Sequence, residues 1–133
     1  MRCTILILTS FVSLVTVLPS GAHHSFVTEY DTQKIITISG KVTEVWYQNP
    51  HSRVYVEVVG VGVGGQTELW ETETYPRNIL DRRGWKHGDL VAGDEVVVTG
   101  RRARNGSNRL QILSIVRPSD GWEGVGFSPD SID

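Results

Sequence analysis

ITISGKVTEVWYQNPHSRVYVEVV, residues 36–59, is the stretch that decides the fold. Two runs rich in β-branched and aromatic residues flank a short segment, QNPH, at residues 48–51. Proline fixes its own φ angle and has no N–H group to donate to a strand ladder, so the chain is expected to turn at Pro50. Gly40 interrupts the first run, which predicts a bulge or a sharp bend there, as at the corner of a barrel. In the second run valine occupies every other position from 54 to 58, which is typical of a strand with one buried face.

Strand patterns continue on both sides of a single helix candidate. The five expected strands are residues 35–47, 52–59, 67–75, 95–104 and 109–117. The helix is expected over residues 76–85, because Pro76 suits a helix start and Gly84 a helix end. Three strands, a short helix and two strands is the order of the oligonucleotide/oligosaccharide-binding (OB) barrel. We therefore expect a mainly β protein, a five-stranded OB-like barrel with one short helix between strands 3 and 4; a small sandwich is the alternative.

The first 22 residues have the composition of a secretory signal. Arg2 precedes an apolar run that ends at Leu18. The small residues Ser20 and Ala22 occupy the positions that signal peptidase recognises before its cleavage site. The run is shorter than the roughly 20 apolar residues that a transmembrane helix needs. We expect residues 1–22 to be a cleaved signal peptide, residues 23–118 to form the OB-like domain, and residues 119–133 to be a mostly loose tail. An uncleaved anchor helix is the alternative.

Cleavage after Ala22 defines what the mature protein contains. It removes Arg2 and no acidic residue, so the formal net charge changes from −2 to −3, and it takes away the single cysteine, Cys3. The mature protein would then have no disulfide and no thiolate chemistry. We expect a periplasmic or secreted monomer without a membrane span after cleavage, whose partner is an unidentified protein or envelope ligand.

The histidines are candidate metal ligands. Cleavage makes His23 the first residue, whose α-amine and imidazole can chelate one ion, and His24 adds a further nitrogen. His51 could supply another if residues 23–34, expected to form an irregular arm, fold back on the turn. Imidazole and amine nitrogens suit copper, which heads the affinity series of divalent metals. In the alternative interpretation His23 and His24 are a solvated pair, and His51 fixes its own loop. His87 is expected to lie on the surface.

A metal-free binding surface is the second hypothesis. An OB barrel can hold a protein, a glycan or another envelope polymer on its face. The candidate ligand-binding residues are Tyr47, Asn49, Arg53, Tyr55 and Trp70. Arginines also flank the Asn105-Gly106 turn, namely Arg101, Arg102, Arg104 and Arg109. Nucleic-acid binders are usually basic, whereas the mature chain is acidic, so we expect no nucleic-acid partner and interpret these arginines as a solvated hairpin.

The sequence gives little support for catalysis. Glu71 and Glu73 are expected on one strand face, and such pairs can perform acid–base work, but simple solvated alternation explains them. The nucleophile-elbow, zinc-protease, redox Cys-x-x-Cys and phosphate-loop motifs are absent from the sequence. We therefore do not expect an enzyme; an oxidative copper site built on the N-terminal amine is the third hypothesis.

An ordered set of short motifs runs from Ala22 to Pro118. They are Ala22-His23-His24-Ser25-Phe26, Asp31-x-x-Lys34, Gly40-x-Val42, Asn49-Pro50-His51, Arg82-Arg83-Gly84-Trp85, Gly93-Asp94-Glu95-Val96 and Gly106-Ser107-Asn108. This set resembles an exported bacterial domain family of unknown function. The resemblance implies a secreted or periplasmic small β-barrel without an assigned activity. Tyr47 stands where such proteins usually have tryptophan, so the donor geometry of that ring differs here if it lines a site.

Overall fold

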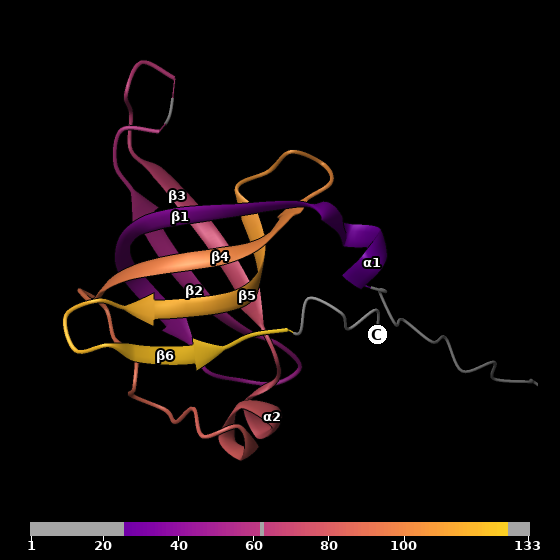
Figure 1. Ribbon diagram of the computed structural model, residues 1–133, viewed down its shortest axis with the longest axis vertical. Coiled ribbons are helices and arrows are strands. Elements are labelled where there is room, and N and C mark those ends of the chain that lie inside the picture. Colours follow the sequence, from indigo (N-terminus) through magenta and orange to yellow (C-terminus); the bar gives the residue numbers. More distant parts are fainter. Residues whose placement is uncertain (1–25, 62, 128–133) are drawn as a thin grey trace, which may run out of the picture.

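A computed structural model describes residues 26–61 and 63–127 of the chain. His23, His24 and the expected signal peptide lie outside the described residues. The elements are α1 (Phe26–Glu29), β1 (Tyr30–Trp46), β2 (Ser52–Val58), β3 (Glu68–Thr74), α2 (Arg77–Arg82), β4 (Glu95–Ala103), β5 (Arg109–Arg117) and β6 (Trp122–Val125) (Figure 1). Neither helix in this part of the chain is long and apolar enough to cross a bilayer.

The sheet closes on itself. Its strand order is β3-β2-β1-β4-β5-β6, and β3 also pairs with β5, which joins five strands into a ring. The β3–β5 pairing is parallel, whereas the other pairings are antiparallel. The short helix α2 lies between β3 and β4 in the chain. The prediction of a mainly β, five-stranded OB-like barrel with one helix between strands 3 and 4 is therefore confirmed.

Strand β1 belongs to two sides of the barrel. It pairs with β4 up to Lys41 and with β2 from Lys41 onward, with a register shift between Val42 and Glu44. Gly40 lies at this change of partner, and a Cβ atom there would stand 2.2 Å from the carbonyl oxygen of Glu57. Such a distance leaves no room for a side chain, so glycine is required where the two sides meet. The register shift lies two residues beyond Gly40, close to the position where the bulge or bend was predicted.

The barrel interior is filled by alternating aliphatic side chains. Val54, Val56 and Val58 of β2 are buried, as their spacing predicted. The helix α2 lies at one end of the barrel (Figure 1) and inserts the fully buried Leu80 into this core. Gly84 follows the helix with a φ angle of 88°, a left-handed conformation that glycine adopts without steric cost. The predicted helix is thus confirmed, with Pro76 just before its first residue.

The N-terminal arm is more regular than expected. Residues 23–34 were expected to be irregular, but within the described residues α1 ends at Glu29 and β1 already begins at Tyr30. Tyr30 pairs with Ala103 of β4 and is completely buried, and its hydroxyl donates a hydrogen bond to Glu73 of β3. A buried phenol with a partner for its hydroxyl stabilises an early start of the strand.

The tail also departs from the prediction. Residues 119–133 were expected to be mostly loose, but β6 forms within them and pairs with β5 from Ser114 to Arg117. Two aromatic residues explain the order: Trp122 packs edge-on against Trp85, and Phe127 packs against Tyr75 at 4.0 Å between ring centroids. Large aromatic side chains bury enough apolar area to hold a short edge strand in place.

Replacing Gly40 tests the account of the β1 bend. Gly40→Ala is expected to lower the free energy of unfolding by about 3 kcal/mol, because the added methyl group collides with backbone rather than with a movable side chain. Urea denaturation followed by tryptophan fluorescence measures the change. Ser39→Ala, at the neighbouring exposed position, is the control and should remain within about 0.5 kcal/mol of the wild type. Equal midpoints for the two variants would contradict the account.

Candidate functional site

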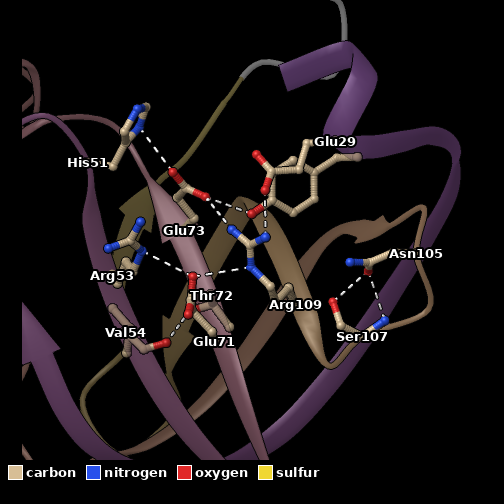
Figure 2. A network of polar contacts seen from close by, with 11 residues as sticks. Glu29, His51, Arg53, Val54, Glu71, Thr72, Glu73, Asn105, Ser107 and Arg109 are labelled. Carbon is tan, nitrogen blue, oxygen red and sulfur yellow. Dashed lines mark hydrogen bonds and ion pairs between the residues drawn. The ribbon is translucent and has the colours of Figure 1, made fainter. Parts of the chain in front are cut away.

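Seven polar side chains gather on the outer face where β3 meets β5. We call them the Glu73 cluster: Glu29, Tyr30, His51, Arg53, Glu71, Glu73 and Arg109. They come from the end of α1, the start of β1, the β1–β2 turn, and strands β2, β3 and β5 (Figure 2). The cluster therefore joins segments that are far apart in the sequence.

Glu73 is the centre of the cluster. It is only 3% exposed, and both of its carboxylate oxygens are engaged. Oε1 lies 3.1 Å from His51 Nδ1, while Oε2 accepts a hydrogen bond from the Tyr30 hydroxyl at 2.7 Å and another from Arg109 Nη2 at 3.3 Å. A buried carboxylate is costly unless it is hydrogen-bonded and paired, so these partners are what allow Glu73 to occupy this position.

Arg109 connects Glu73 to two other carboxylates. The parallel β3–β5 register sets Arg109 opposite Glu71, and its Nε atom lies 3.2 Å from Glu71 Oε1. Its Nη1 atom donates to Glu29 Oε1 at 2.5 Å, which ties the end of α1 to the barrel. Burial lowers the pKa of the Arg109 guanidinium, but its hydrogen bond to Glu29 and the surrounding negative charge outweigh this effect and raise the pKa above its ordinary value. Arg109 is therefore a permanent cation.

Tyr30 remains a proton donor to Glu73. Burial, and then the charge and hydrogen bond of the Glu73 carboxylate, raise the pKa of the Tyr30 hydroxyl far above its ordinary value. The neutral form is the one that donates, so Tyr30 keeps the proton that links the start of β1 to β3 at neutral and moderately alkaline pH.

His51 is the one imidazole of the cluster and lies about one-third exposed at the end of the β1–β2 turn. Its Nδ1 atom faces the Glu73 carboxylate, as Figure 2 shows. In a neutral histidine the ring nitrogen that carries no proton holds the lone pair with which the side chain can ligate a metal. A carboxylate beside one ring nitrogen is an arrangement that orients metal-binding histidines.

The other sequence-predicted residues take separate positions. Tyr47 donates to Asp81 at 2.9 Å and also contacts the Trp85 carbonyl oxygen, so its ring joins the β1 end to α2. Burial and the Asp81 hydrogen bond raise the pKa of Tyr47 to about 12. Asn49 is exposed in the turn, and its peptide bond to Pro50 is cis. Trp70 is in the hydrophobic core and only 5% exposed, so its ring is not presented at the surface.

Arg53, a member of the Glu73 cluster, also contacts a group of aromatic side chains that includes Tyr55, which pairs with Glu71 across β2 and β3. Arg53 pairs with Glu71 at 3.1 Å, and its guanidinium lies 5.8 Å from the centre of the Trp46 ring. Trp46, which is 37% exposed, packs edge-on against Tyr55 at 5.3 Å between ring centroids. We call Trp46, Arg53 and Tyr55 the aromatic patch.

Of the seven residues of the cluster, the sequence analysis predicted only His51 and Arg53 as site residues. It interpreted Glu73 as solvated and Arg109 as part of a solvated hairpin, and both interpretations are wrong. Arg101 of the same hairpin is also buried, with Nη1 donating to Gln111. The position of Arg109 could have been predicted from the OB strand order, because that order brings the acidic strand β3 beside the start of β5. Pairing the two strands would have placed Arg109 opposite Glu71.

Within residues 26–61 and 63–127, no group of three or more histidine, cysteine or acidic side chains is arranged to hold a metal ion. His51 is the sequence-predicted metal ligand that falls in this part of the chain. His23 and His24 lie outside it.

Removing Glu73 tests the energetic role of the cluster. Glu73→Ala is expected to lower the free energy of unfolding by about 3 kcal/mol, because Arg109 and Tyr30 lose a buried partner. Denaturant unfolding, read by circular dichroism, measures the effect. Glu57→Ala removes an exposed carboxylate from the adjacent strand and should change stability by less than about 0.5 kcal/mol. If both variants unfold at the same denaturant concentration, the cluster does not stabilise the barrel.

Comparisons with known proteins identify the family. A solved structure of the small single-stranded DNA-binding protein from Streptomyces coelicolor aligns with 62% of this chain and 89% of its own, at 22% identity and a TM-score of 0.44. A search of curated proteins finds no match. The profile described as "Family of unknown function (DUF6152)" matches residues 12–111, which is most of the chain. The expected resemblance to a family of unknown function is confirmed, and the chain belongs to the DUF6152 family.

Proposed function

We propose that this protein is exported and binds a copper-like metal ion through His23, His24 and His51. Cleavage after Ala22 would make His23 the first residue, with its α-amine and imidazole both available as ligands. Imidazole and amine nitrogens are donors that copper prefers. His51 would complete the site from the β1–β2 turn.

The observation that carries the proposal is that the Glu73 carboxylate contacts His51 and Tyr30 at the same time. One carboxylate oxygen contacts His51, and the other accepts the hydroxyl of Tyr30. Tyr30 is six residues after His24, and a segment of that length spans at most about 21 Å whatever its conformation. The arm that would carry the terminal histidines therefore starts at the same carboxylate that holds His51.

The Glu29–Arg109 pair supports the same geometry. Glu29 lies one residue before Tyr30, and its contact with Arg109 holds the end of α1 against the β3–β5 side of the barrel. Figure 2 shows His51 and Glu29 on either side of Glu73, with their side chains turned toward one cluster. A ligand set drawn from the arm and from His51 would thus need no rearrangement of the barrel.

Copper titration of the mature protein tests this proposal. Protein recovered after native export should begin at His23 by mass spectrometry and bind one Cu(II) ion per chain. His51→Ala and His23→Ala are each expected to weaken binding by at least about tenfold, since each removes nitrogen ligands. Calorimetry with a competing chelator measures the affinity.

His87→Ala is the matched control, because His87 is exposed and contacts Tyr47 rather than the Glu73 cluster. It should bind copper as the wild type does. Identical affinities in the wild type and in the His23 and His51 variants would overturn the proposal, as would a mature terminus elsewhere in the chain.

A second candidate function is metal-free binding of a protein, a glycan or another envelope polymer on the barrel face. The aromatic patch favours it: Trp46 and Tyr55 offer partly exposed rings, and Arg53 and Glu71 offer a donor and an acceptor beside them. The patch balances positive and negative groups, which suits a neutral or weakly charged ligand better than a polyanion.

Tyr55→Ala discriminates between the two functions. If the patch is the binding surface, this variant should lose an envelope ligand that the wild type retains in the presence of a chelator, with copper affinity unchanged. Leu69→Ala, at an exposed apolar position on the neighbouring strand, is the control. Retention assays on immobilised envelope polysaccharide, with and without chelator, give the readout. Ligand retention that chelation abolishes would contradict this second function.

A further inference from the structure

We infer that the first half of β1 is an open sheet edge that binds an extended peptide segment carrying a basic side chain. The segment adds a strand to the barrel beside residues 35–39. This inference goes beyond the proposed copper-binding function and is independent of it, because it involves no residue of the proposed metal site.

The barrel ring is closed along only part of β1. From Ile35 to Lys41 this strand pairs with β4 on one side, while its pairing with β2 begins only at Lys41. Beyond Val58 the chain leaves β1 and enters the β2–β3 loop, which projects from the barrel (Figure 1). Across the described chain, no strand therefore pairs with the second side of residues 35–39.

The backbone hydrogen bonds of Val42 indicate which groups this edge exposes. Its N–H and carbonyl groups both bond to residues 93–94, just before β4, and the register to β4 has no shift between positions 35 and 41. Along an antiparallel strand these directions alternate, so the N–H and carbonyl groups of Ile35, Thr37 and Ser39 point away from β4. Each of the three residues thus offers one donor and one acceptor, which is the pattern that an added strand needs.

The edge lacks the usual devices against strand addition. Natural edge strands carry lysine, proline or a bulge that prevents pairing with another chain. Residues 35–39, IITIS, contain no charged residue and no proline, and they pair with β4 without a register shift. The side chains of Ile35, Thr37 and Ser39 are exposed beside the open backbone groups. A bound strand can therefore pack its own side chains against them.

An exposed hollow of about 500 Å³ lies where the edge ends. Its lining includes Ser39, Gly40, Lys41, Glu57, Val59 and Glu95. Lys41 is opposite Glu57 in β2 and opposite Glu95 in β4, so one cation stands between two carboxylates and the formal charge is −1. The aliphatic stem of a lysine or arginine from the bound segment can lie on Val59 while its charged end approaches the carboxylates. This charge complementarity assigns a basic side chain to the segment.

A synthetic peptide tests the inference. It has about eight residues of alternating valine and threonine, with arginine near its N-terminus, because a strand antiparallel to β1 begins at the hollow. Fluorescence anisotropy measures its binding to protein purified from cells that express the full chain, in the presence of a chelator. The arginine peptide should bind at least about tenfold more tightly than the same peptide with glutamate in place of arginine. Equal affinities, or no binding by either peptide, would overturn the inference.

Two N-methylated forms of the arginine peptide test the mode of binding. N-methyl groups on every second residue remove the N–H groups that face β1 in one form, and those that face away from it in the other. Only the first form should lose binding, by at least about tenfold, because it lacks the donors of the added ladder. An equal loss in both forms would contradict strand addition. This readout alters the peptide alone, so it does not depend on the folding of any variant.

Thr37→Pro removes an outward N–H from the edge itself. Proline is tolerated on edge strands where the N–H faces solvent, so the ladder to β4 should remain. Thr37→Ala is the matched control, since both variants lose the hydroxyl contact with Thr99 at 2.9 Å but alanine keeps the N–H. Peptide affinity should fall at least about tenfold in Thr37→Pro and stay within about twofold of the wild type in Thr37→Ala. Equal affinities of the two variants would refute the assigned edge. In sedimentation velocity, a dimer that Thr37→Pro abolishes would assign the edge to a second copy of this chain and overturn peptide binding.

Discussion

The parallel pairing of β3 with β5 is the contact on which the rest of the structure depends. It closes five strands into a ring and thereby brings an acidic strand against an arginine. Closure buries Glu73, and a buried carboxylate has to be matched by donors and positive charge. Arg109 from β5 and Tyr30 from β1 supply these groups. The topology of the barrel therefore determines which charged and polar groups meet on this face.

This arrangement holds the end of α1 and the start of β1 against the barrel. Glu29 and Tyr30 are each anchored to the β3–β5 seam, and His51 contacts the same carboxylate from the other side. The aromatic patch lies next to the cluster through Arg53 and Glu71. Both candidate functions therefore use one face, and they differ in which side chains receive the ligand.

Local patterns predicted the fold well, because strands and turns depend on neighbouring residues. The expected boundaries of the last barrel strand agree with β5, Arg109–Arg117, and Asn105-Gly106 forms the hairpin turn before it. The cluster was harder to predict because its contacts are long-range: Tyr30 and Glu73 are 43 residues apart, and Arg109 and Glu29 are 80 apart. Alternation indicates which side of a strand a residue faces, but not that a neighbouring element will cover it, as happened to Glu73. His51 was predicted as a site residue, whereas its carboxylate partner was not.

The strand β6 has a practical consequence for how the domain is delimited. It covers the backbone of β5 from Ser114 to Arg117, and the chain continues past it to pair again with Ile112 and Leu113. A protein shortened to end at Pro118 would leave that edge of β5 with unsatisfied amide and carbonyl groups next to apolar side chains. Bare strand edges of this kind recruit other chains, so such a fragment would be prone to self-association and aggregation.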